Sequence, residues 1–248
     1  MKGGPLTAEA LPRVLLVEDD PISRAFLSAA LDTVPCEVDS ADGMAAALAL
    51  ARSQRYDAWL LDAHLPDGSG IALLHRLRTL HPDTPVLAHT ASRDASLHDS
   101  LRQAGFAEVV VKPLPASAMR GRVRALLGLP TTPDTGAPMA SATGNAPVWD
   151  DEAAARALNG NLAHVQTLRG LFLQELSHVR DEIAAAYQRG DHAHMQRALH
   201  KLRASCGFVG ARRLAGAVQA LEARASDAQA WSAFQQAAGE TQETPTDR

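Results

Sequence analysis

Three acidic residues and one lysine in the first half of the chain stand directly after short apolar runs. Glu18 and Asp19 follow the first run, Asp62 follows the third and Lys112 follows the fifth. If the runs are parallel strands, their carboxyl ends share one edge of a sheet and the four side chains converge there. Clustered carboxylates need a cation between them, and hard oxygen ligands favour Mg²⁺ over zinc or copper. An aspartate beside Mg²⁺ and a lysine is suited to attack a phosphoryl group, because both cations neutralise charge on the transferred group.

Two other polar residues near these runs are less informative. Thr90 ends the fourth run, where its hydroxyl is placed to donate to phosphoryl oxygens. Asp20 is better interpreted as a helix N-cap, since Pro21 behind it suits the first helical turn. Any single acidic residue here would more often be a solvated loop charge, so the prediction depends on the convergence of the whole group.

The elements that must position these residues are strands alternating with helices over residues 13–127. Short β-branched or apolar runs are each followed by an amphipathic stretch, which predicts an α/β fold. We expect a doubly wound, five-stranded parallel sheet of flavodoxin-like topology with helices on both faces. The predicted strands are Val14–Val17, Cys36–Val38, Ala58–Leu61, Val86–His89 and Val109–Val111.

The composition changes after residue 127. Residues 128–148 are rich in Pro, Gly, Ser and Thr and have no apolar period, which predicts a linker. A flexible linker of this length spans roughly 25 Å, so Asp62 and His200 can meet within one molecule but need not. Residues 1–12 are predicted to be an N-terminal tail.

The second half is predicted to be an all-α, up-and-down helical bundle over residues 149–240, followed by a tail over 241–248. Apolar residues recur at helical spacing through Leu162–Arg189, and Gly190-Asp191 then supplies a helix stop and a new N-cap. Gly210 is expected to end the next helix. A short final helix containing Trp231 and Phe234 should fray from Gly239.

One of the ten histidines, His200, has surroundings suited to phosphoryl chemistry. It lies roughly 140° around the helix from the apolar stripe, so we expect its imidazole to face solvent, where it is a competent nucleophile. Arg203, one turn on, can hold phosphoryl oxygens, and the small Ala204 leaves room for a partner. The short pattern is not specific by itself, because His75 has an arginine at the same spacing.

Longer motifs in the first half resemble a known family. In order along the chain they are Val14-Leu-Leu-Val-Glu-Asp-Asp-Pro21, Trp59-Leu-Leu-Asp62-Ala-His-Leu-Pro66-Asp-Gly68-Ser-Gly70, His89-Thr90-Ala91 and Val111-Lys112-Pro113. Residues 13–127 thereby resemble a response-regulator receiver domain. The resemblance implies that Asp62 is the phosphoacceptor and that Thr90 and Lys112 contact the phosphoryl oxygens. It also implies Mg²⁺ as cofactor, held by Glu18, Asp19, Asp62 and the backbone carbonyl of His64.

The segment around His200 is similar to a histidine-containing phosphotransfer (HPt) domain. The resemblance is carried by Ala198-Leu-His200-Lys-Leu-Arg203-Ala204-Ser-Cys-Gly-Phe-Val-Gly210-Ala211. It implies that His200 is phosphorylated and that Arg203 replaces the usual lysine. Ala204 stands where glycine is usual.

Together these features predict a phosphorelay protein of a two-component system. A partner histidine kinase would phosphorylate Asp62, and His200 would exchange the group with this or another receiver. Such a chain is a phosphoryl carrier, not an enzyme for a small-molecule substrate, with only self-catalysed phosphorylation and dephosphorylation at aspartate. The alternative is a response regulator whose helical domain binds partners without being phosphorylated.

Composition excludes several other classes. A formal net charge of −4 and the lack of a basic recognition helix argue against a nucleic-acid partner. The longest apolar stretch, Met44 to Ala51, is far too short to cross a membrane. Two distant cysteines without CxxC spacing are typical of a reducing compartment, so a cytoplasmic location is expected.

Overall fold

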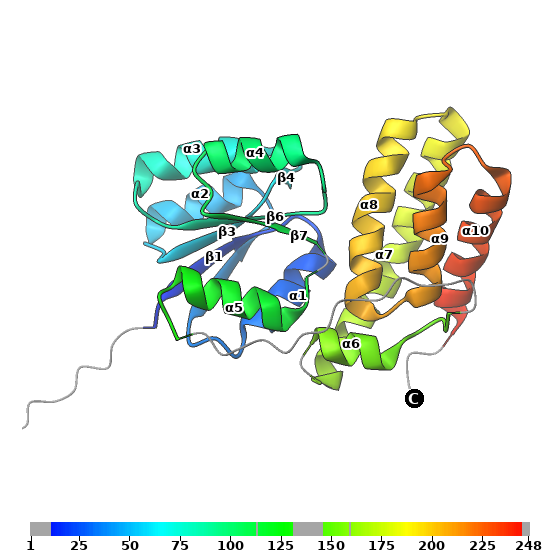
Figure 1. Ribbon diagram of the computed structural model, residues 1–248, viewed down its shortest axis with the longest axis horizontal. Coiled ribbons are helices and arrows are strands. Elements are labelled where there is room, and N and C mark those ends of the chain that lie inside the picture. The colour runs from blue at the N-terminus through cyan, green and yellow to red at the C-terminus, as the bar shows by residue number, and fades with distance from the viewer. Residues whose placement is uncertain (1–10, 113, 131–145, 159, 245–248) are drawn as a thin grey trace, which may run out of the picture.

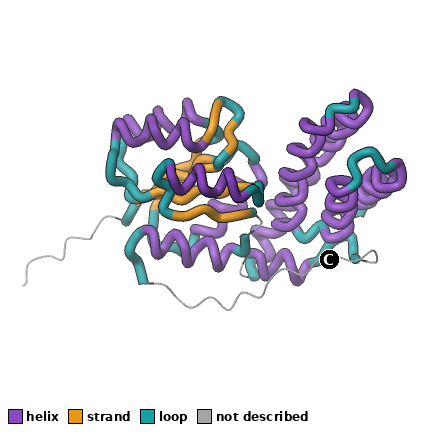
Figure 2. The backbone as a smooth tube through the Cα atoms, turned by 45° about the horizontal axis from the view of Figure 1, so that its top comes forward, coloured by secondary structure: helices purple, strands orange, loops and turns teal. Residues whose placement is uncertain are grey.

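The computed structural model describes residues 11–112, 114–130, 146–158 and 160–244. An α/β half and a helical half lie side by side (Figure 1). A view turned by 45° shows the strands gathered in the first half, with only helices and loops in the second (Figure 2). Most of the predicted linker, residues 131–145, and most of the predicted N-terminal tail lie outside the described residues.

The first half contains the predicted five-stranded parallel sheet, with strand order β2-β1-β3-β6-β7. Helices α1 and α5 pack on one face, and α2, α3 and α4 pack on the other (Figure 1). The strands are β1 (Arg13–Val17), β2 (Glu37–Ala41), β3 (Ala58–Asp62), β6 (Val86–Thr90) and β7 (Glu108–Val111). The helices are α1 (Pro21–Leu31), α2 (Met44–Ser53), α3 (Gly70–Leu80), α4 (Ala95–Gln103) and α5 (Ala116–Leu126).

The apolar strands β3 and β6 are buried along their whole length. Burial on both faces is what a parallel sheet covered by two helical layers requires. Along β3, alternate residues serve opposite layers: Leu60 packs with α1 and α5, while Trp59 and Leu61 pack with α2, α3 and α4. The α/β prediction is therefore confirmed.

The chain directly after Asp62 forms a small hairpin that the sequence did not reveal, β4 (His64–Leu65) with β5 (Gly68–Ser69). It leads into α3 through Gly70. A Cβ at Gly70 would lie 2.4 Å from the backbone oxygen of Asp62, so glycine allows α3 to begin against the end of β3. The predicted N-cap at the first helix is confirmed, since an Asp20 carboxylate oxygen accepts from Ser23 N at 2.7 Å.

The second half is helical throughout its described residues, which confirms the predicted bundle. Its helices are α6 (Asp151–Ala157), α7 (Leu162–Arg189), α8 (His192–Val209), α9 (Arg212–Ala223) and α10 (Ala228–Glu243). Glycine ends α7 and α8 in the left-handed region, with φ 67° at Gly190 and 75° at Gly210. Between them Asp191 caps α8 by accepting from His194 N. In the parts of the chain that are described, no helix combines the length and apolar character needed to cross a lipid bilayer.

Two features of the bundle differ from expectation. The short helix α6 was not predicted, because seven residues carry too little apolar periodicity to be recognised. The last helix does not fray from Gly239 but continues to Glu243. Ala237, Ala238 and Thr241 are buried, so tertiary packing holds its final turns in place.

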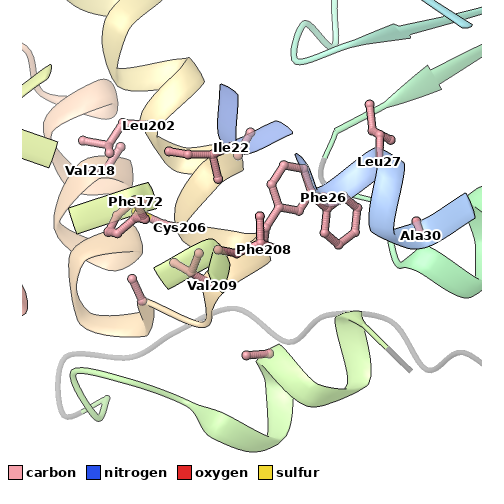
Figure 3. Close-up of a cluster of buried hydrophobic side chains, with 14 of the residues drawn as sticks. Ile22, Phe26, Leu27, Ala30, Phe172, Leu202, Cys206, Phe208, Val209 and Val218 are labelled. Atoms are coloured by element: carbon pink, nitrogen blue, oxygen red, sulfur yellow. The ribbon is translucent and has the colours of Figure 1, made fainter. Parts of the chain in front are cut away.

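The two halves share one hydrophobic core across their boundary. Phe26 of α1 stacks on Phe208 of α8 with ring centroids 4.0 Å apart and planes 14° from parallel. Both side chains are buried, and Ile22 of α1 belongs to the same cluster as residues of α7 and α8 (Figure 3). An apolar interface of this kind stabilises docking through removal of hydrocarbon surface from water.

Replacing Phe208 with alanine should weaken docking of the halves by about 3 kcal/mol, the usual scale for truncating a buried phenylalanine. Hydrogen exchange of the α1 backbone amides should become faster in the F208A protein. The control is Y187A, which removes a stack on Trp231 inside the bundle (4.2 Å between centroids) without touching α1. Unchanged α1 protection in F208A would contradict the role of this contact.

Candidate functional site

The carboxyl ends of the strands hold a buried cluster of opposite charges. Lys112 Nζ lies 2.5 Å from Glu18 Oε2 and 2.7 Å from Asp62 Oδ2. All three side chains are nearly inaccessible to solvent. The convergence expected from three separate strand ends is therefore present.

Asp62 is held in place by the backbone around it as well as by the lysine. Its Oδ1 accepts from His64 N at 2.9 Å. Thr90 is fully buried at the end of β6, where its Oγ1 accepts from Ser92 N at 3.1 Å, so its own hydroxyl hydrogen remains available to donate. Lys112 N donates to Thr90 O at 2.8 Å, which ties the two residues together.

The charges of the cluster keep Asp62 ionised. Burial by itself would raise the pKa of Asp62, but the charge of Lys112, followed by that of His89 and the His64 N–H, holds that pKa below its ordinary value. Burial likewise acts to lower the pKa of Lys112, while Glu18 and Asp62 raise it well above the ordinary lysine value. The site therefore presents a carboxylate anion beside an ammonium group.

The residues present fit a hard divalent cation. Asp19 Oδ1 is buried and has no hydrogen-bond partner among the described residues, while Glu18 and Asp62 offer further carboxylate oxygens. An oxygen-only donor set of this kind suits Mg²⁺. His89, which was not predicted to take part, is fully buried at the end of β6 with Nδ1 3.2 Å from Glu18 Oε2. Its ring nitrogen and the oxygens of Glu18 and Asp62 lie within 4.8 Å of one another.

His200 does not face solvent as the helical pattern predicted. Its side chain is 29% exposed, and Nε2 contacts the backbone carbonyl of Ala91 in the first half. The face of α8 opposite the bundle core is the face that meets the α/β half, so the expected solvent is replaced by protein. His75, the residue with the similar short pattern, is exposed on α3.

The surroundings of the His200 ring bear on which nitrogen carries the proton. A carbonyl oxygen only accepts, so the contact with Ala91 favours a hydrogen on Nε2. On the other side, Nδ1 lies 3.2 Å from Glu222 Oε1 and 3.1 Å from an Arg203 guanidinium nitrogen. Glu222 favours the tautomer with hydrogen on Nδ1, whereas Arg203, which also pairs with Glu222, favours a bare Nδ1.

Glu222 and Lys201 were not predicted from sequence. Glu222 lies on α9, 22 residues from the histidine, and the only signal for it in the sequence was the pair Leu221-Glu222, which belongs to the segment that resembles an HPt domain. Lys201 reaches across the boundary to Asp19, with Nζ 2.6 Å from Oδ2.

A cavity of about 380 Å³ lies between the two halves. Asp62 and Lys112 line it from the first half, and His200, Lys201 and Ala204 line it from the second. The structure thus brings the predicted aspartate and the predicted histidine to one half-open cavity between the halves. Ala204 is buried at this boundary, so its small side chain borders the cavity instead of an open surface.

Family comparisons match the two halves separately. The model of the response regulator receiver domain matches residues 14–124, and the Hpt domain model matches residues 167–244. The chain is 39% identical over 127 residues to the probable transcriptional regulatory protein TcrX of Mycobacterium tuberculosis, covering 50% of this chain and 54% of that protein. It is 28% identical over 228 residues to the virulence sensor protein BvgS of Bordetella pertussis, covering 86% of this chain and 18% of that protein.

The chain therefore spans about half the length of the first relative and less than a fifth of the second. Among solved structures, it is 32% identical to the non-phosphorylated HemR receiver domain from Leptospira biflexa, with a TM-score of 0.45. That similarity covers 50% of this chain and 98% of the other.

Glu222→Ala should shift the His200 imidazole about tenfold toward the tautomer with hydrogen on Nε2, because a hydrogen bond to a charged group is worth about 1.5 kcal/mol. Nitrogen-15 NMR shifts of the ring report this ratio directly. Glu222→Gln is the matched control, since its amide oxygen still accepts from Nδ1–H and should change the ratio by about threefold at most. An unchanged ratio in E222A would rule out control by Glu222.

Proposed function

We propose that this chain, which joins a receiver domain to an Hpt domain, passes phosphoryl groups between its own Asp62 and His200. The supporting observation is the shared cavity lined by both residues. A partner histidine kinase would phosphorylate Asp62, and His200 would later donate to a separate receiver. As a carrier, the chain would need only the self-catalysed chemistry of its aspartate.

In the transfer step, His200 Nε2 attacks the phosphorus of the Asp62 aspartyl phosphate. A phosphorus–nitrogen bond forms, the bond from phosphorus to the Asp62 oxygen breaks, and Asp62 leaves as a carboxylate. The imidazole hydrogen stays on Nδ1, where Glu222 Oε1 faces it at 3.2 Å. In the reverse step an Asp62 carboxylate oxygen attacks the phosphorus, the phosphorus–nitrogen bond breaks, and the His200 imidazole leaves.

The surrounding residues have distinct roles in this proposal. Lys112 and the Thr90 hydroxyl hold phosphoryl oxygens, and Arg203 does so on the histidine side. Glu18, Asp19, Asp62 and the His64 carbonyl would hold Mg²⁺, which when bound supplies charge neutralisation to the phosphoryl group.

One observation favours the second candidate function, in which the helical domain only binds partners. Nε2 of His200 is occupied by the Ala91 carbonyl, and a protonated nitrogen has no lone pair for attack. If that contact persisted in solution, His200 would be idle. The two candidates differ in one measurable product, phosphohistidine.

Labelling with a small-molecule phosphodonor should mark Asp62 and His200 in the unaltered chain. D62N should lose both labels, because His200 receives its group from Asp62, and H200Q should keep the base-labile label at Asp62. H75Q is the matched control for a histidine with the same short pattern and should behave like the unaltered chain. If D62N still labels His200 to the same extent, the internal relay is wrong.

Transfer within one chain can be separated from transfer between chains. A mixture of D62N and H200Q chains can form phosphohistidine only between molecules. At micromolar concentration the mixture should be slower by on the order of a thousandfold, since tethering gives an effective concentration near millimolar. Equal rates in the mixture and the unaltered chain would refute transfer within one molecule.

A further inference from the structure

Lys201 links the helical half to the acidic site of the other half. It is one of only three lysines in the chain and follows His200 directly on α8. Its Nζ donates to Asp19 Oδ2 at 2.6 Å, across 182 residues of sequence. Both lysines of the described residues, Lys112 and Lys201, therefore point to the same group of carboxylates.

The receiver half alone leaves this site with unbalanced charge. Its carboxylates are those of Glu18, Asp19, Asp20 and Asp62, and Lys112 is the ammonium among them. The Arg24 guanidinium also lies beside the site, where it donates to the backbone oxygens of Glu18 and Asp19, so four negative charges face two positive ones and an excess of two remains. Lys201 reduces that excess when the bundle is docked.

Lys201 keeps its charge in this position. Its partial burial acts to lower its pKa, but the hydrogen bond to Asp19 and the charges of Asp19, Asp62 and Asp20 outweigh burial and raise the pKa above the ordinary value. The side chain is still 52% exposed, so the ion pair by itself adds little to docking. The apolar cluster that contains Phe26 and Phe208 holds the halves together, and Lys201 changes the charge at the acidic site.

A divalent cation would use the same carboxylate. Asp19 Oδ1 is the buried oxygen without a hydrogen-bond partner, and Oδ2 of the same group holds Lys201. We propose that Lys201 couples bundle docking to the charge of the acidic site, so that Mg²⁺ binding and docking weaken each other. The inference rests on the Mg²⁺ site of the proposed function. Repulsion between an ammonium and a dication on one carboxylate supplies the coupling, and linkage makes it reciprocal.

Calorimetric titration of the full chain with Mg²⁺ tests the first direction. K201Q should bind Mg²⁺ about fivefold more tightly than the unaltered chain, at the lower end of typical coupling between sites. R197Q is the matched control, because Arg197 is exposed on the same helix and lines the same cavity. Its loss removes an equal charge without removing the contact to Asp19, so its Mg²⁺ affinity should stay close to that of the unaltered chain.

Hydrogen exchange of α1 tests the reverse direction. Saturating Mg²⁺ should speed exchange of the α1 amides about fivefold in the unaltered chain and leave exchange in K201Q unchanged. Equal Mg²⁺ affinities in K201Q and the unaltered chain would overturn the coupling while leaving the metal site intact. Failure of every variant to bind Mg²⁺ would overturn the coupling together with the metal part of the proposed function. Neither result depends on phosphoryl transfer.

Discussion

Negative charge buried at the carboxyl edge of the parallel sheet is the constraint on which the rest of this structure depends. Carboxylates placed together away from water are tolerated only when cations lie among them. Lys112 is the cation supplied by the same sheet, in contact with Glu18 and Asp62. Without it, burial would push the pKa of Asp62 upward and favour the neutral acid. The ion cluster thus keeps Asp62 in its carboxylate form.

The helical half also places polar side chains at this buried negative charge, from outside the sheet. Helix α1 begins two residues after Asp19, so the surface that the bundle binds is joined rigidly to the acidic site. Apolar packing of α1 against α8 then places two polar side chains of α8 at that site, His200 and Lys201. Hydrophobic contact between the halves fixes the position of these two side chains, and their charges and hydrogen bonds act on the acidic site.

Local signals in the sequence predicted most of the fold and the acidic half of the site. Apolar period and capping residues act within a few positions of the chain. They predict that Asp62 and Lys112 stand at strand ends, and they predict the bounds of α7. Local signals did not predict the position of Glu222 beside His200 or the contact of Lys201 with Asp19, because both arise from the packing of elements that are distant in sequence. For His200, one property was predictable from local signals and another was not. Its helical phase was correctly taken as opposite the bundle core, but what covers that face depends on docking.

In the proposed function, the proton on His200 sets the last condition for phosphoryl transfer. Docking brings Nε2 to the Ala91 carbonyl, which favours a hydrogen on the nitrogen that attacks in the proposed step. Transfer therefore needs the ring to leave Ala91 and to carry its hydrogen on Nδ1 toward Glu222. The cost is about one hydrogen bond, roughly 1 kcal/mol, which is small beside the entropy already lost in docking. The docked arrangement is thus one proton shift and one ring movement from the state of His200 that the proposed transfer needs.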